Sequence, residues 1–292
     1  MPEKSRVAGL ARRPDMAGIV RRLPRLILVV VLLVGASQGT TLAAPASWDY
    51  VALGDSLATG FGAFKGYVPR YDAYIETDTG VVVTRTNLGQ NGWTSSQLLS
   101  ALRNDPTLRR ATREAEIVTW NIGGNDLRAA RKSYKQGTCG GFDNQDCLRA
   151  GVAKLKTNWD DIRAEVLELR STGNTIVRTM DIYNPYVRTD IVSDTWQYDC
   201  GMNYCGMNDF QVFQIYLDQV NDHIASTSNS AGIPYARVYL AFNGTNGDED
   251  PKSKGYLSFD GVHPNNTGHR IIADELRKVG YLEIDPVALD PR

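Results

Sequence analysis

Apolar positions along the chain fall into two alternating patterns: short runs, most of them rich in β-branched residues, and longer stretches with helical spacing. The short runs predict buried strands, and they cover residues 48–53, 81–88, 116–122, 175–180 and 234–240. The longer stretches predict amphipathic helices, over residues 67–78, 146–169, 207–227 and 266–279 and from Thr94 or Ser95 through Leu98, Leu99 and Leu102. This alternation predicts an α/β fold, with a five-stranded parallel sheet covered by helices on both faces.

The segments between these elements are glycine-rich or polar. Residues 54–66 contain four glycines, and residues 243–254 are polar and acidic. Residues 127–146 and 181–206 predict two longer loop excursions. The first contains Cys139 and ends just before Cys147, and the second contains Cys200 and Cys205 and is rich in tyrosine and tryptophan. Asn243, Asp248 and Asp250 are a weak candidate for a Ca²⁺ site, because the spacing of an EF-hand is absent.

The first 46 residues have the pattern of a secretory signal peptide. Seven basic residues precede residue 26, residues 26–36 are uninterrupted apolar or small, and Ala44-Pro45-Ala46 is a small-residue exit. The alternative is a membrane anchor, but about 20 apolar residues are needed to span a bilayer. We therefore expect residues 1–46 to be a cleaved leader, residues 47–292 to form a single domain, and the protein to be secreted without stable insertion in the membrane.

Charge argues against a polyanionic partner. The whole chain has 32 basic and 33 acidic residues, and removal of the leader leaves 25 basic and 31 acidic ones. Nucleic acids and anionic membranes select clustered lysine and arginine. We expect no nucleic-acid partner, and we expect a monomer.

The four cysteines are Cys139, Cys147, Cys200 and Cys205. Export favours disulfides, and four cysteines allow three connectivities. We predict the local pairs Cys139–Cys147 and Cys200–Cys205. The alternative, a zinc site, finds no support in the spacings.

The first predicted strand ends in Gly54, Asp55 and Ser56. Ligands of open α/β sheets bind at the carboxyl ends of the strands, so Ser56 is either a turn residue or a nucleophile. Gly-Asp-Ser alone favours a turn. A nucleophile needs a base, an orienting acid and donors for an oxyanion from elsewhere in the chain.

Asp260 and His263 supply the first two requirements. A single turn can place the Asp260 carboxylate against one ring nitrogen of His263 and leave the other nitrogen for Ser56. The remaining histidines, His223 and His269, lie in predicted helices at positions that indicate the surface, so we expect neither to be catalytic.

Gly92 and Asn125 follow the second and third predicted strands. The Gly92 N–H and the Asn125 side-chain amide, together with the Ser56 N–H, would give three oxyanion donors. Alone, each is better explained as a turn residue, and the specific signal is the set.

This set resembles the SGNH hydrolase family, also called GDSL esterases and lipases. Its four sequence blocks occur in order without substitution: Gly54-Asp55-Ser56-Leu57, Gly92 within Asn-Leu-Gly-x-x-Gly-x-Thr, Gly123-Gly124-Asn125-Asp126, and Asp260-Gly261-Val262-His263-Pro264. The resemblance covers residues 48–279 and implies a flavodoxin-like three-layer α/β/α fold. It also implies the roles given above to Ser56, Gly92, Asn125 and His263. The strand-embedded G-x-S-x-G elbow of α/β-hydrolases is absent.

We therefore expect a serine esterase or lipase that hydrolyses carboxylic esters without metal or cofactor. Lipid or simple acyl esters are the first choice of substrate, because Tyr183, Tyr186, Trp196 and Tyr198 would suit an acyl groove. The same rings would also stack on sugars, which leaves a carbohydrate O-acetyl esterase as the alternative. A non-catalytic binding protein on this fold is a weaker alternative, because none of the motif residues is missing.

Overall fold

The computed structural model describes residues 46–171, 175–193, 195 and 206–284. The chain divides into Met1–Ala43 and Ala44–Arg292, and the described residues belong to the second unit. Five strands of this unit form one parallel sheet in the order β2-β1-β3-β4-β5. Their bounds are Ser47–Gly54 for β1, Val82–Asn87 for β2, Ile117–Asn121 for β3, Ile176–Met180 for β4 and Tyr235–Ala236 for β5. The predicted parallel α/β fold is confirmed.

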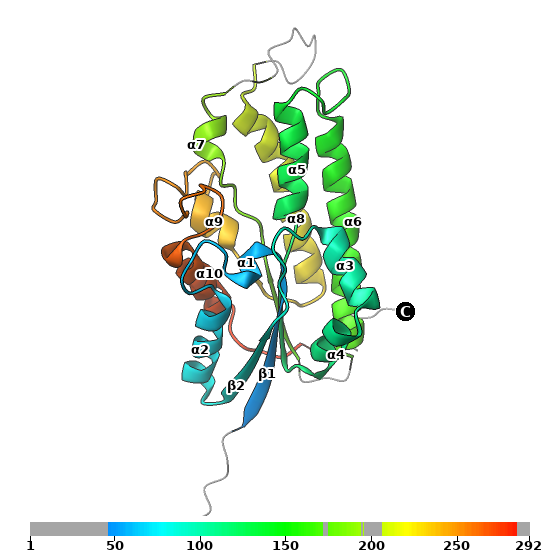
Figure 1. Cartoon of the computed structure of the whole chain (residues 1–292), viewed down its shortest axis with the longest axis vertical. Helices are drawn as coiled ribbons and strands as arrows, with labels where there is room; N and C mark the ends of the chain where they lie inside the picture. The colour runs from blue at the N-terminus through cyan, green and yellow to red at the C-terminus, as the bar shows by residue number, and fades with distance from the viewer. Residues whose placement is uncertain (1–45, 172–174, 194, 196–205, 285–292) are drawn as a thin grey trace, which may run out of the picture. The chain divides into compact units, whose positions relative to one another are not determined.

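Helices cover both faces of this sheet (Figure 1). One face carries α3 (Ser95–Asn104), α4 (Pro106–Glu114), α5 (Gly124–Lys135), α6 (Asp146–Leu169) and α8 (Asp209–Ser230). The other face carries α2 (Val68–Thr79), α9 (Val238–Asn243) and α10 (Asn266–Lys278). Two short helices, α1 (Ser56–Thr59) and α7 (Val187–Asp190), complete the described set.

Strand β1 shows how the sheet separates two cores. Val51 and Leu53 pack into the core under α3, α6 and α8, whereas Tyr50 and Ala52 pack into the core under α2 and α10. Successive side chains of a strand point to opposite faces, so a run that is apolar at every position is the pattern of a strand covered on both sides. The central strands therefore hold their carboxyl ends in fixed positions, where α1 and α5 begin.

Two predicted segments differ from the structure. Residues 127–146 were expected to be loop, but most of α5 lies there, and its buried face consists of Leu127, Ala130 and Tyr134. The predicted strand over residues 234–240 is too long, because β5 has two residues and α9 starts at Val238. A short apolar run fits a buried strand and a buried helix equally well, which is the physical reason for the second error.

The cysteines and the leader are described only in part. Cys139 and Cys147 form a disulfide between α5 and α6, as predicted. Cys200 and Cys205 lie outside the described residues, as does the predicted leader except for its last residue. In the described ranges no helix has both the length and the apolar character that a membrane span requires.

Candidate active site

Ser56 lies where β1 turns into α1. Gly54 ends the strand at φ +137°, and a Cβ there would lie 2.3 Å from the carbonyl oxygen of Asn121, so only glycine fits. Asp55 then caps α1, since its Oδ1 accepts a hydrogen bond from the Leu57 N–H at 3.0 Å. Ser56 is the first helical residue, and this tight corner directs its hydroxyl to the carboxyl edge of the sheet.

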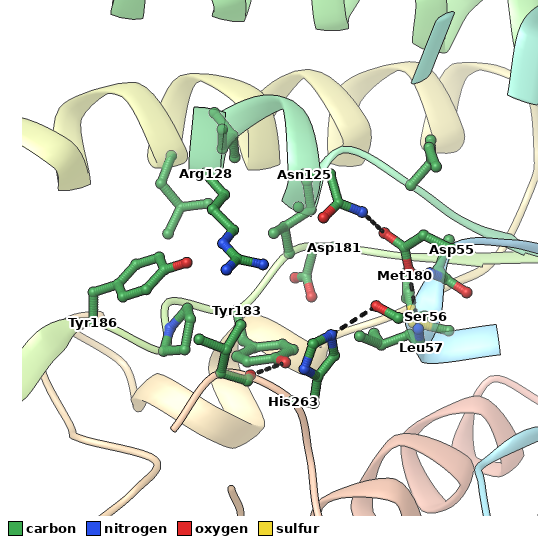
Figure 2. Close-up of a pocket in the computed structure, with 18 of the residues that line it drawn as sticks. Asp55, Ser56, Leu57, Asn125, Arg128, Met180, Asp181, Tyr183, Tyr186 and His263 are labelled. Atoms are coloured by element: carbon green, nitrogen blue, oxygen red, sulfur yellow. Dashed lines mark hydrogen bonds between the residues drawn. The ribbon is translucent and has the colours of Figure 1, made fainter. Parts of the chain in front are cut away.

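His263 lies beside Ser56 at this edge (Figure 2), and Asp260 contacts the other nitrogen of the His263 ring. The His263 Nε2 lies 2.9 Å from the Ser56 Oγ, and its Nδ1 lies 2.5 Å from the Asp260 Oδ2. A carboxylate at Nδ1 selects the tautomer with the proton on that nitrogen, which leaves Nε2 free to accept the serine proton. This is the geometry of a nucleophile, its base and an orienting acid.

The Asp260 carboxylate is stabilised in its charged form. Partial burial acts to raise the pKa of Asp260, but hydrogen bonds from the His263 side chain, the Val262 and His263 N–H groups and the Ser258 hydroxyl together lower it below its ordinary value. The acid therefore stays ionised and keeps the His263 ring oriented.

Asp55 is a second carboxylate beside the serine, but it is buried. Its Oδ1 accepts from the Asn121 amide at 2.7 Å, and the Tyr67 hydroxyl donates to the Asn121 Oδ1 at 2.9 Å. Burial raises the pKa of Asp55 to about 6, against the opposing effects of the hydrogen bonds from Leu57 and Asn121 and of the charge of His263. The sequence singles out Asp55 only as part of its motif, and its side chain connects β1, α1 and β3.

The two remaining predicted oxyanion residues differ in position. Asn125 lines the cavity beside Ser56, and its amide nitrogen donates to the Trp93 carbonyl at 2.9 Å and approaches the Asp55 Oδ2 at 3.4 Å. Gly92 is exposed at φ +79° and does not line this cavity. The turn that contains Gly92 contacts the site through the next residue, Trp93, whose carbonyl accepts the hydrogen bond from Asn125. The role of Gly92 as an oxyanion donor stays a prediction.

A cavity opens beside Ser56 and His263. Its walls are mainly apolar, formed by Ile122, Leu127, Met180, Ile182, Tyr183, Pro185, Tyr186, Phe213, Leu217 and Val262. Such walls suit an apolar substrate, and polar groups placed among them fix its orientation. Besides Asp55, the charged side chains of Arg128 and Asp181 line this cavity (Figure 2). Neither residue was predicted from the sequence.

Two of the predicted aromatic residues lie in the cavity wall. The Tyr183 hydroxyl donates to the Val262 carbonyl at 2.7 Å, which connects this segment to the residue before His263. The Tyr186 ring lies under the Arg131 guanidinium at 3.8 Å, and Arg131 also pairs with the buried Asp190. Trp196 and Tyr198 lie outside the described residues.

Asp181 is an additional buried carboxyl in this wall. Burial raises the pKa of Asp181 to about 7, although the Tyr239 N–H donates to its Oδ1 at 2.6 Å. It follows the end of β4, and that position at the carboxyl edge is the signal by which the sequence could have indicated it.

The other two histidines lie away from Ser56. The prediction that His269 is on the surface is wrong, because its side chain is fully buried and its Nδ1 accepts from the Tyr67 N–H at 3.2 Å. His269 has helical spacing with the buried residues Ile272, Ala273 and Leu276, and this periodicity marks the buried face of α10. His223 is partly exposed and contacts Asp160 at 3.1 Å.

The acidic loop after α9 has its polar groups engaged internally. Asn243 is buried, with its Oδ1 accepting from the Asn184 N–H at 2.8 Å and its amide donating to the Asn184 carbonyl at 2.8 Å. Asp250 accepts from the N–H groups of Lys252 and Ser253. No cluster of three or more histidine, cysteine, aspartate or glutamate side chains suited to a metal occurs in the described residues.

Comparison with known proteins finds a family model that matches most of the chain. A model of the GDSL-like lipase/acylhydrolase family matches residues 52–271. The spore germination lipase LipC of Bacillus licheniformis is 27% identical over 238 residues, which cover 80% of this chain and 96% of that protein. The uncharacterized protein YpmR of Bacillus subtilis is 31% identical over 142 residues, which cover 47% of this chain and 52% of YpmR.

Solved structures show the same fold. The lipase Lip_vut3 from a goat rumen metagenome superposes with a TM-score of 0.63 at 24% identity, covering 80% of this chain and 98% of that one. An acetylxylan esterase from Geobacillus stearothermophilus, Axe2, superposes with a TM-score of 0.52 at 18% identity, covering 82% and 98%. Both identities are low, so these likenesses bear on architecture.

Proposed function

Since the chain belongs to the GDSL-like lipase/acylhydrolase family, and is therefore a carboxylic ester hydrolase, we propose that it is a serine esterase that forms an acyl-enzyme on Ser56. The observation that supports this most directly is the continuous contact from Ser56 Oγ to His263 Nε2 and from His263 Nδ1 to Asp260 Oδ2. Ser56 and His263 lie in the wall of the apolar cavity at this edge of the sheet, and Asp260 lies next to it.

In the proposed reaction, His263 Nε2 takes the proton of Ser56 as Oγ attacks the ester carbonyl carbon. The tetrahedral intermediate then collapses: the bond to the leaving oxygen breaks, and the imidazolium donates its proton to the departing alcohol. Water, deprotonated in turn by His263, attacks the acyl-enzyme and releases the acid and free Ser56. Asp260 stabilises the imidazolium in both halves without being protonated.

The Ser56 N–H, the Gly92 N–H and the Asn125 amide are the proposed donors to the oxyanion. The Asn125 amide lines the cavity, and its hydrogen bonds to Trp93 and Asp55 fix its orientation before substrate binds. Donors held in place in this way stabilise the developing charge without reorganisation. Gly92 does not line the cavity, so of the three proposed donors its participation has the least support.

Lipid or simple acyl esters are the proposed substrates. The support is the cavity, whose walls are mainly aliphatic and aromatic and would bury an acyl chain. A carbohydrate O-acetyl ester is the second candidate, because the rings of Tyr183 and Tyr186 in the same wall would also stack on a sugar. We further propose that the enzyme acts outside the cell, with residues 1–46 removed during export.

Covalent labelling tests the proposed reaction. A fluorophosphonate probe is expected to modify Ser56 in the wild-type protein and to leave Ser56→Ala unlabelled, with the modified peptide identified by mass spectrometry. Hydrolysis of p-nitrophenyl butyrate should fall by roughly 10⁶ in Ser56→Ala. The matched control is Ser253→Ala. Ser253 lies in the loop before Asp260, and its hydroxyl donates to the Asp250 carboxylate. Full esterase activity in Ser56→Ala would rule out this mechanism.

A rate panel with three substrates separates the two classes of ester. A medium-chain p-nitrophenyl ester, a phospholipid and acetylated xylan would be compared by kcat/KM under one set of conditions. We expect the first two to be hydrolysed faster, since the cavity wall is apolar. A clear preference for acetylated xylan would instead support the carbohydrate esterase.

A further inference from the structure

Three phenylalanines that face solvent lie in two loops beside the proposed catalytic base. Phe61 is 43% exposed, Phe64 is 99% exposed and Phe259 is 93% exposed. Single exposed apolar residues are common on protein surfaces, but apolar residues gathered beside a binding site indicate an interaction surface. We refer to these three residues as the aromatic rim.

The rim residues come from two loops that touch each other and the base. A Cβ on Gly62 would lie 3.0 Å from the His263 Cβ and 3.1 Å from the Ser258 Oγ, so residues 60–64 pack against residues 258–264. The Phe61 ring centroid lies 4.6 Å from that of His263. The loop between α1 and α2 and the loop between α9 and α10 accordingly lie next to each other (Figure 1).

The chemistry of this surface fits the boundary of a lipid bilayer. Aromatic rings partition into the region between headgroups and acyl chains, and lysines beside them reach the phosphates. Lys65 follows Phe64 directly, and Lys252 lies against Gly261 in the other loop, with its Nζ 3.8 Å from a Cβ built there. Both lysines are exposed.

Continuity with the cavity favours a bilayer over a second copy of the chain as the occupant. An ester that leaves a lipid layer has to reach Ser56 without crossing water. The Phe61 ring of the rim contacts His263, which forms part of the cavity wall. A bilayer on the rim would therefore place its acyl chains beside the cavity. A second copy on the same surface would instead obstruct it.

We propose that the aromatic rim inserts into the surface of a phospholipid bilayer and thereby docks the active site on aggregated lipid esters. This rests on the esterase activity proposed above and deepens it. The aromatic rim holds the enzyme on the lipid surface that contains the substrate, whereas Ser56, His263 and Asp260 cleave the ester bond.

The test compares Phe64→Ser, Phe259→Ser and the double variant with the wild-type protein. Binding is measured by flotation with phosphatidylcholine vesicles, and hydrolysis with the same vesicles and with soluble p-nitrophenyl butyrate. We expect vesicle binding and vesicle hydrolysis to fall about tenfold per phenylalanine, and soluble-ester rates to stay unchanged. The matched control is Phe142→Ser, which replaces a phenylalanine that is 74% exposed beyond the far end of α5 from Asn125.

Each outcome separates the two proposals. Flotation of the Ser56→Ala protein measures the rim without catalysis, so failure of the esterase proposal leaves this measurement valid. Wild-type levels of vesicle binding and hydrolysis in the double variant would overturn the rim proposal. So would a dimer, detected by light scattering, that the double variant abolishes, because the rim would then bind another copy of the chain.

Discussion

Asp260 accepts four hydrogen bonds from within its own short segment of chain. The donors are the Ser258 hydroxyl, the Val262 and His263 N–H groups, and the His263 ring. Three of these bonds do not depend on the imidazole, so the carboxylate is held in place when the ring changes its protonation state. The acid thus orients His263 from a position that is itself fixed.

Replacement of this acid tests how much that orientation contributes. In Asp260→Asn the side-chain shape is kept, but the amide favours the wrong tautomer of His263, and we expect kcat to fall by roughly 10⁴. The measurement is kcat and KM on a soluble ester, with Asp250→Asn as the matched control, since Asp250 caps the preceding loop. A loss of less than tenfold would mean that Asp260 is not the orienting acid.

The residues that contact one another at the site could be proposed from the sequence only because of their positions relative to the elements. Ser56 and Asn125 follow strand ends, and Asp260 and His263 precede a helix. Asp181 also follows a strand end, so the same signal applied to it and was not used. Arg128 could not be singled out in this way, because its side chain belongs to the site only through the packing of α5 beside the cavity. Burial of Asp181 is likewise a property of the fold.

At the scale of elements, α10 is attached to the loop after α1 by a buried histidine. The Nδ1 of His269 accepts from the Tyr67 N–H at 3.2 Å, and its Nε2 lies 3.4 Å from the Phe61 carbonyl oxygen. Burial lowers the pKa of His269 to about 4, in spite of the hydrogen bond to Phe61. The imidazole is therefore neutral where these elements are packed together.

This attachment predicts a loss of stability in acid. The unfolded chain binds a proton at His269 near pH 6.5, whereas the folded chain binds it near pH 4, so stability is present above pH 6.5 and falls as the pH decreases to 4. The loss amounts to about 3 kcal/mol. Burial raises the pKa of Asp55 and of Asp181, which acts in the opposite direction over the same pH range, so the His269 contribution is read as a difference between two proteins. Between pH 7.5 and 4, the free energy of unfolding measured with urea should change less favourably in the wild-type protein than in His269→Gln, by about 3 kcal/mol.

The matched control is His223→Gln, because His223 is a partly exposed histidine on α8 that contacts Asp160 at the surface. An equal change in the free energy of unfolding for the wild-type protein and His269→Gln would contradict the role assigned to His269.

Periodicity predicted long elements and failed for short or charged ones. The apolar residues that predict α6 by their spacing of three or four are the ones that the structure buries: Leu148, Val152, Leu155, Trp159, Ile162, Val166 and Leu169. Helix α5 was missed because Arg128, Arg131, Lys132 and Lys135 give it a charged face, and only three of its residues are buried. Its basic residues instead meet tertiary partners, as when Arg131 pairs with Asp190. Such pairs depend on segments far apart in sequence.

At the scale of the whole molecule, a disulfide in the described part of the chain connects the segment after α5 to α6, and the proposed leader precedes the fold. The bridge Cys139–Cys147 closes a loop with a sequence separation of 8. A crosslink of this length contributes about 2 to 3 kcal/mol when formed. Disulfides form in oxidising compartments, which agrees with the proposal that the chain is exported.

Export predicts the composition of the protein recovered outside a secreting host. We expect its amino terminus to be Ser47, its mass to lack the hydrogens of two disulfides, and the pairs to be Cys139–Cys147 and Cys200–Cys205. Peptide mapping under non-reducing conditions checks all three. Protein that stays in the membrane fraction with residues 1–46 attached would show instead that this segment is an anchor.

The nucleophile and its base are made at different times during translation, because Ser56 and His263 are separated by 207 positions in the chain. A ribosome makes β1, α1, β3 and Asn125 early, and the segment with Asp260 and His263 late, followed by α10, which packs against α2. Both proton-handling groups are thus added in one short step, after all five strands of the sheet have been made. A nascent chain that stops before residue 263 has Ser56 at the end of β1 but lacks its base. The esterase is therefore inactive while this part of the chain is still being made.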